Sequence, residues 1–120
     1  MKLIEMLEPD FSFEDERGSL VQLVREGYRQ VNVICSKKGS FRGGHYHKLT
    51  KEAFYVIEGS FLLEAEKDGV KEAKTFSAGD MFLINEYIVH SFDYLEDTIL
   101  VSMYNNGVEY GDEKDIVNAK

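Results

Sequence analysis

Residues 39–59 read GSFRGGHYHKLTKEAFYVIEG, and this stretch carries the strongest signal in the sequence. Its spacing is G-x5-H-x-H-x4-E-x6-G, in which His45 and His47 are two residues apart and Glu52 follows five residues after His47. Residues two apart on a β-strand point to the same face of a sheet, so both imidazoles can bind one ion. A carboxylate that opens the next strand can bind it too. The segment therefore predicts a divalent metal site.

The sequence on both sides of this stretch predicts an all-β protein. Short β-rich runs alternate with turn signals such as Asp68-Gly69, and helical periodicity is weak throughout. The expected strands are Leu20–Val24, Val31–Ser36, Ala53–Ile57, Ser60–Glu66, Val70–Phe76, Met81–Ile84, Val89–Tyr94 and Thr98–Tyr104. We expect a single domain over residues 1–120 with a barrel core at about 13–104. Residues 1–10 are a candidate edge strand, open to exchange with a neighbouring subunit, and residues 105–120 a polar tail, loop or short helix.

Residues 39–59 resemble the first sequence motif of the cupin superfamily at every defining position. A second cupin motif with one more histidine is expected to follow. In the run that starts at Gly79, the third histidine of the chain, His90, occupies that place, although Asn85 and Tyr87 stand where cupins usually have Pro and Gly. The resemblance implies a cupin jelly-roll β-barrel, also called a double-stranded β-helix.

The resemblance also implies that His45, His47, Glu52 and His90 hold one divalent metal ion per chain. Neutral imidazoles with one carboxylate suit Zn, Fe, Mn, Ni or Cu, and this set of ligands does not choose among them. Because histidine must be neutral to bind a metal, affinity is expected to weaken as the pH falls through about 6. The alternative is a barrel that keeps these residues as a polar or catalytic cluster without metal.

A narrower resemblance concerns the class of substrate. Residues 13–20 are similar to the opening of sugar-nucleotide cupins, the group that contains the sugar 3,4-ketoisomerases. Residues 42–59 are more similar to the C-terminal cupin domain of bifunctional capsular polysaccharide biosynthesis enzymes, which binds zinc and epimerises a keto-sugar nucleotide. The ketoisomerases typically have Gln in place of Glu52 and work without metal, so the comparison favours zinc. It implies an epimerase or isomerase that binds a nucleotide sugar in the barrel.

Such a reaction needs groups that move a proton and groups that bind a diphosphate. Tyr46, Tyr55 and Tyr87 are the candidate catalytic residues, although strand alternation places Tyr46 on the face opposite His45 and His47. Arg42 and Lys48 flank the histidine pair and are the candidate substrate-binding residues.

Composition limits the other possibilities. The net charge of −8 argues against nucleic acid and anionic membranes as partners. A single cysteine, Cys35, excludes an internal disulfide, and the charged N-terminus argues against a signal peptide, so we expect a cytoplasmic protein. A cupin that binds a small ligand without turnover, and a metal-dependent cupin dioxygenase, remain alternatives. Because small cupins commonly pair through their sheets, we expect a homodimer.

Overall fold

The computed structural model describes residues 2–106 and 115–118, and within these residues the protein consists of strands and connecting loops. No helix in this part of the chain is long and apolar enough to cross a membrane. The strands are β1 (Ile4–Leu7), β2 (Phe11–Asp15), β3 (Gly18–Gln22), β4 (Gln30–Ser36), β5 (Phe41–His47), β6 (Glu52–Glu58), β7 (Ser60–Lys67), β8 (Val70–Ser77), β9 (Met81–Ile84), β10 (Val89–Tyr94), β11 (Thr98–Tyr104) and β12 (Ile116–Asn118).

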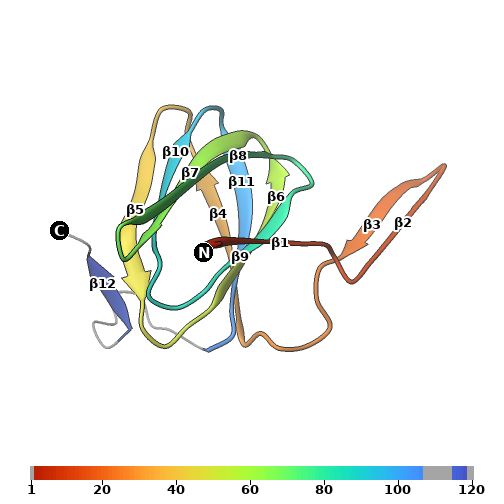
Figure 1. Cartoon of the computed structure of the whole chain (residues 1–120). Helices are drawn as coiled ribbons and strands as arrows, with labels where there is room; N and C mark the ends of the chain where they lie inside the picture. Colours follow the sequence, from red (N-terminus) through yellow and green to blue (C-terminus); the bar gives the residue numbers. More distant parts are fainter. Residues whose placement is uncertain (1, 107–114, 119–120) are drawn as a thin grey trace.

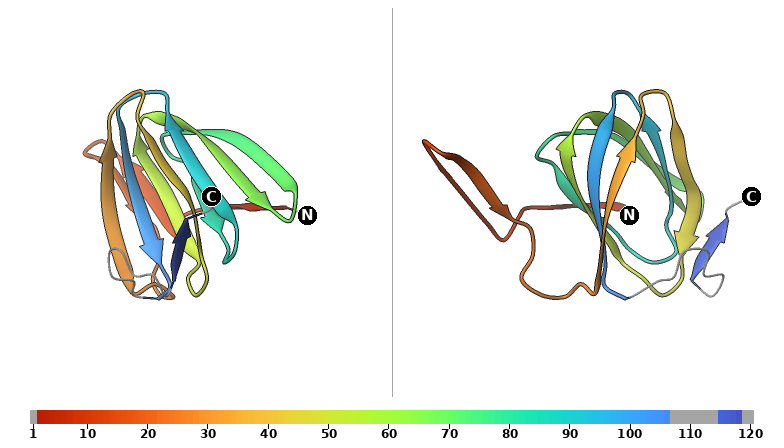
Figure 2. Two further views of the ribbon diagram at one scale, coloured as in Figure 1. Left: turned by 90° about the vertical axis from the view of Figure 1, so that its left-hand side faces the viewer. Right: turned by 180° about the vertical axis from the view of Figure 1, so that it is seen from behind.

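Ten of these strands build two five-stranded antiparallel sheets that face each other (Figures 1 and 2). The first sheet has the order β1-β9-β6-β11-β4 and the second has the order β12-β5-β10-β7-β8. Strands β2 and β3 pair only with each other and form a hairpin that stands clear of the barrel in Figure 1. The predicted all-β, single-barrel architecture is therefore confirmed in outline.

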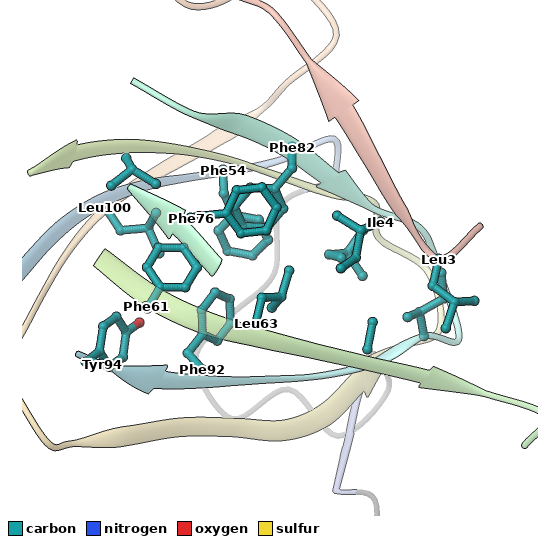
Figure 3. Packing of buried hydrophobic residues seen from close by; sticks show 14 residues of the cluster. Leu3, Ile4, Phe54, Phe61, Leu63, Phe76, Phe82, Phe92, Tyr94 and Leu100 are labelled. Atoms are coloured by element: carbon teal, nitrogen blue, oxygen red, sulfur yellow. The ribbon is translucent and has the colours of Figure 1, made fainter. Parts of the chain in front are cut away.

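An aromatic core fills the space between the two sheets (Figure 3). Alternate residues of each strand point inward, and the largest buried side chains include Phe54, Phe61, Phe76 and Phe82. The rings of Phe76 and Phe82 stack with centroids 4.2 Å apart, and Phe61 packs against Phe92 at 5.3 Å. The same core reaches His90, whose ring centroid lies 6.1 Å from that of Phe92. A close-packed apolar wall therefore supports one side of the histidines.

A second apolar cluster covers the outer face of the first sheet. Its buried members are Ala53, Met81, Val101 and Met103, and Leu23, Val24, Tyr28 and Tyr55 are among the half-buried residues that pack on them. The segment between β3 and β4 contributes three of these side chains, so it is fixed to the sheet surface after leaving the hairpin.

Most predicted strands agree with the structure. Strands β9, β10 and β11 begin and end at the predicted residues, and residues 4–7 form an edge strand that pairs with β9. The strand predicted at Leu20–Val24 begins and ends two residues earlier in the structure. The hairpin strand β3 covers Gly18–Gln22, and the chain then turns onto the outer cluster. The expected polar tail also differs at its described end, where β12 pairs with β5. Residues 107–114 of that tail lie outside the described residues.

Candidate functional site

The site begins at a bulge in β5 that brings this strand against β10. The pairing register shifts between His90 and Ser91, which leaves Gly44 unpaired next to Gly43 and places His45 opposite His90. Both glycines have positive φ, at 105° for Gly43 and 76° for Gly44. A Cβ on Gly43 would lie only 2.5 Å from the backbone oxygen of His90, so only glycine fits this crossing. The Gly-Gly pair therefore sets the distance between His45 and His90.

Three imidazoles and one carboxylate converge beside this bulge. His45, His47 and His90 each offer a ring nitrogen, and these atoms lie within 4.8 Å of one another. Glu52, the first residue of β6, places its Oε1 atom 3.2 Å from His47 Nε2 and 3.4 Å from His90 Nε2. His47, Glu52 and His90 are buried, whereas His45 is half-buried. The structure thus brings together all four predicted ligands, and His45 is the member nearest to solvent.

In each buried member of this cluster, the second side-chain nitrogen or oxygen atom makes a hydrogen bond. His47 Nδ1 lies 2.7 Å from Asp115 Oδ2, and His90 Nδ1 lies 2.9 Å from the carbonyl oxygen of Ile88. Because a carboxylate or carbonyl oxygen only accepts, each Nδ1 carries a proton, and in the neutral imidazole Nε2 keeps a lone pair. The Ser102 hydroxyl donates to Glu52 Oε2 at 2.8 Å. These contacts aim two nitrogens and one oxygen at a common point.

This arrangement fits a metal ion. Among the described residues, the buried atoms His47 Nε2 and Glu52 Oε1 have no hydrogen-bond partner, although they lie close together. Unpaired buried polar atoms are costly, and a bound cation would satisfy both. Partners on the far side of each ligand, which fix its tautomer and orientation, are typical of metal sites. Nitrogen ligands with one carboxylate suit a first-row transition metal or zinc.

Burial and neighbouring charges shift the pKa values of His45, His47 and Glu52. Burial and the neighbouring His90 and His47 lower the pKa of His45 to about 4. Burial alone would lower the pKa of His47, but the carboxylates of Glu52 and Asp115 outweigh it and raise that pKa. Burial opposes ionisation of Glu52, but His47 and His90 lower its pKa to about 2. Glu52 is therefore an anion and His45 a neutral imidazole at any physiological pH.

Two residues near the cluster were not among the candidates predicted from the sequence. Asp115 is buried, and it accepts hydrogen bonds from the Leu49 backbone N–H as well as from His47. Tyr104 pairs with Glu52 across the sheet and packs its ring 5.4 Å from that of His47. Burial and the Glu52 carboxylate raise the pKa of Tyr104. Strand alternation could have indicated Tyr104 as an inward residue of its predicted strand, whereas no local pattern marks Asp115.

The three predicted tyrosines lie apart from the histidines. Tyr55 packs in the outer cluster of the first sheet; it is three residues from Glu52 and points to the other face. Tyr46 alternates with the histidines along β5 and packs against Tyr87 at 5.9 Å. Tyr46 and Tyr87 line a shallow surface pocket of about 390 Å³ with Glu66, Lys67, Asp68 and Val89, and the four candidate ligands do not line it. The site is therefore defined by its ligand cluster and not by this pocket.

Arg42 and Lys48 stand at opposite sides of the histidine pair. The Arg42 guanidinium reaches across to β4, where it donates to Ser36 Oγ at 2.9 Å and to the Cys35 carbonyl at 3.4 Å. Lys48 is exposed, and its backbone N–H donates to the carbonyl of Asp115. Six residues separate them along the chain, so their Cα atoms lie at most about 20 Å apart, and β5 is bulged at Gly43 and Gly44 within this stretch.

Comparisons with known proteins place this geometry in context. The model of the polysaccharide biosynthesis C-terminal domain family matches residues 13–115. No curated protein sequence matches the chain. Among solved structures, a 3,4-ketoisomerase from Thermoanaerobacterium thermosaccharolyticum in complex with TDP is similar, with a TM-score of 0.80 and 21% identity over 98% of this chain and 88% of that chain.

Two epimerases are similar as well. A 3′-monoepimerase from Streptomyces bikiniensis has a TM-score of 0.77 and 19% identity over 93% of this chain and 69% of its own. The dTDP-4-dehydrorhamnose 3,5-epimerase from Sulfolobus tokodaii has a TM-score of 0.73 and 22% identity over 88% of this chain and 72% of its own. The shared architecture confirms the predicted cupin jelly roll.

Proposed function

The chain belongs to the polysaccharide biosynthesis C-terminal domain family, and from this membership we propose that it is an isomerase or epimerase of a keto-sugar nucleotide. The observation that carries the proposal is the buried cluster of His45, His47, Glu52 and His90 inside the barrel. Structurally similar proteins include sugar ketoisomerases and epimerases, and several of their structures contain TDP or a TDP-sugar.

Isomerising or epimerising a keto-sugar requires removal of a proton from the carbon next to the carbonyl and its return elsewhere. In our proposal His45, His47, Glu52 and His90 hold a divalent ion, with zinc favoured by the resemblance. When bound, the ion supplies positive charge to polarise the keto oxygen. Glu52 contributes a permanent negative charge, Ser102 orients it, and Asp115 keeps the proton of His47 on Nδ1.

Tyr104 is the residue we propose as the proton donor, in place of Tyr55. Its hydroxyl stays protonated at neutral pH because burial and the Glu52 carboxylate raise its pKa. Its ring packs beside His47 on the inner side of β11. A phenol in this position can return a proton to the substrate or donate a hydrogen bond to a developing enolate.

The same residues also support a metal-free variant of this function. The hydrogen bond to Asp115 fixes a proton of His47 on Nδ1, and the carboxylates of Glu52 and Asp115 raise the pKa of the imidazole, as expected for a general base that uses Nε2. Here His47 abstracts the proton, and Tyr104 remains the donor. The two variants differ in one measurable respect, because only the first requires a bound ion for activity.

Arg42 and Lys48 remain the proposed contacts for the diphosphate. The contribution of each residue is tested by comparing the effects of Arg42→Ala and Lys48→Ala on KM. The variant that removes the true contact raises KM with little change in kcat, because a diphosphate far from the reacting carbon is bound equally in the ground and transition states.

The reaction can be tested without knowing the product. The protein is incubated in D₂O with TDP-4-keto-6-deoxyglucose, and the sugar protons next to the carbonyl are followed by NMR. Solvent deuterium should enter at one of these carbons, and the exchange should disappear in His47→Ala, which removes a ligand in the first variant and the base in the second. The exposed variant Glu64→Gln serves as the matched control and should exchange at the wild-type rate. Absence of exchange with this and other keto-sugar nucleotides, by metal-loaded protein, would contradict the proposed function.

A further inference from the structure

The surface pocket that Tyr46 and Tyr87 share with Glu66, Lys67, Asp68 and Val89 is here called the outer pocket. Tyr46 alternates with the inward-facing histidines along β5, and Val89 lies directly opposite Glu66 on the neighbouring strand β7. Since alternate residues of a strand point to opposite faces, the outer pocket lies on the solvent side of the second sheet. Its volume of about 390 Å³ is within the range of small-molecule sites. It is therefore a second cavity, separate from the interior of the barrel.

Tyr87 is presented to this pocket by an uncommon backbone conformation. Its φ is 64°, in the left-handed region that glycine, asparagine and aspartate adopt more readily than a bulky aromatic residue. The Tyr87 backbone N–H donates to the carbonyl of His47 at 2.7 Å, which fixes the turn before β10. The ring is nevertheless 52% exposed. Backbone strain of this kind is concentrated at ligand-binding positions, so its use to hold a tyrosine at the surface points to a contact with a ligand.

The two tyrosines provide an aromatic surface within the pocket. Their ring centroids lie 5.9 Å apart, and the rings are tilted by 31°. Tyr46 is half-buried and Tyr87 is exposed, so one ring is held by the sheet and the other extends from it. Tyrosine combines a broad apolar face with a hydroxyl group that can donate and accept. Such a pair is suited to a ligand with one apolar face and several hydroxyl groups.

The charged residues of the pocket select among such ligands. Glu66 and Asp68 offer carboxylate oxygens that accept hydrogen bonds, and Lys67 offers a donor. Asp68 has a φ of 52°, which places it at the tight turn between β7 and β8. Lys71 lies directly opposite Glu66 across these strands, so part of the negative charge has a nearby counter-charge. Two carboxylates disfavour an anion such as a diphosphate, and two lysines disfavour an organic cation. A neutral ligand with hydroxyl groups can satisfy both the acceptors and the donor.

We propose that the outer pocket is a carbohydrate-binding site for one neutral sugar residue. The C–H face of the pyranose ring packs on Tyr46 and Tyr87, and its hydroxyl groups donate to Glu66 and Asp68. Lys67 donates to a hydroxyl or ring oxygen of the sugar. No bond is made or broken at this site. The inference goes beyond the proposed reaction on a keto-sugar nucleotide, because it involves different residues and requires neither a metal ion nor turnover.

The first test is an NMR titration of the ¹⁵N-labelled full chain with neutral sugars. The probes are the methyl glycosides of glucose, galactose, mannose and N-acetylglucosamine. At least one should shift the backbone amide signals of Tyr46, Asp68 and Tyr87, with a dissociation constant of about 1 mM. Tetramethylammonium chloride and inorganic phosphate test for a cation or anion site. The proposal would be overturned if these signals moved with either ion and with none of the sugars, or with none of the probes.

Two variants that suit the local backbone then test the contacts. Tyr87→Gly removes the ring at a position where the φ favours glycine, and Asp68→Asn keeps the side-chain shape in a turn that asparagine also tolerates. Each should weaken binding of the sugar at least about fivefold, through the loss of a ring contact or of a charged acceptor. Circular dichroism checks that both variants are folded.

The matched controls lie on the same two strands of the second sheet. Phe41→Ala removes an exposed ring from β5, and Asp93→Asn neutralises an exposed carboxylate on β10; neither residue lines the pocket. Both should bind the sugar within about twofold of the wild type. A folded Tyr87→Gly or Asp68→Asn protein that also binds within about twofold would refute the site. Since the titration needs neither zinc nor a keto-sugar, its result is independent of whether the proposed isomerase activity is found.

Discussion

Replacing Asp115 by asparagine tests how the outer contacts of the cluster control metal binding. In the wild type, Asp115 Oδ2 accepts from His47 Nδ1–H and Oδ1 accepts from the Leu49 backbone N–H at 2.6 Å. An asparagine of the same shape can keep only one of these bonds. If its carbonyl oxygen faces Leu49, its NH₂ group faces His47 and forces the imidazole proton onto Nε2. That nitrogen then has no lone pair for a metal.

The magnitude follows from this change of tautomer. Loss of a partner behind a ligand typically costs 10–100-fold in metal affinity, and we expect Asp115→Asn to lie near about 100-fold because it reverses the tautomer instead of only weakening a contact. This corresponds to about 2.7 kcal/mol. Asp80→Asn, which alters an equivalent carboxylate that accepts from the Ser77 backbone N–H, is the matched control.

The assay is a competition titration with a chromophoric zinc chelator, together with ¹⁵N NMR of the histidine side chains in the metal-free protein. The spectra should show the His47 proton on Nδ1 in the wild type and on Nε2 in Asp115→Asn. A folded Asp115→Asn protein with zinc affinity within about twofold of the wild type would refute this account of the hydrogen bond.

Four further predictions concern other parts of the molecule. Gly43→Ala should lower the free energy of unfolding by about 1–3 kcal/mol, since its Cβ would meet the His90 backbone at a φ of 105°; thermal melting checks this. Phe82→Ala should cost about 3–5 kcal/mol in chemical denaturation because the ring is fully buried in the aromatic core. Tyr104→Phe should reduce turnover at least about 100-fold while zinc affinity stays unchanged, as the hydroxyl donates a proton and holds no metal. Zinc affinity should fall on acidification starting above pH 6.5, because the raised pKa of His47 lets a proton compete at Nε2; titrations from pH 8 to pH 5 that show a decline only near pH 4, the pKa of His45, would contradict this.

The sequence predicted best those features that depend on residues close together in the chain. Strands β9, β10 and β11 were predicted to the residue, because alternating apolar positions between turn signals leave little freedom in where a strand ends. The four candidate ligands named from the sequence also lie together in the structure, since His45 and His47 share a strand face and His90 follows at the spacing of the second cupin motif. Each of these inferences needed only neighbouring residues or a short motif.

The residues that were missed depend on contacts distant in sequence. Asp115 lies 68 residues from His47 along the chain, and only the pairing of β12 with β5 brings them together. The polar C-terminal segment has no periodic pattern from which such a contact could be predicted. Tyr55 was named as a candidate because it is aromatic, and its odd offset from Glu52 on the same strand puts it on the outer face. Strand alternation instead favours Tyr104, which lies on the inner side of β11.

The hairpin of β2 and β3 was not predicted either. Its residues Phe11 and Phe13 are about half exposed in the structure. A sequence pattern reports that a face is apolar and not which molecule covers it.

The most direct test of the site is the metal content of the protein, purified without chelators or an affinity tag and measured by plasma mass spectrometry beside a His47→Ala variant. The account predicts about one zinc ion per wild-type chain and its loss in the variant. Stoichiometric iron would direct attention to oxygen chemistry instead of sugar epimerisation. A folded wild-type protein that takes up no divalent metal under any loading condition would contradict the metal site and leave His47 with Asp115 as a metal-free base.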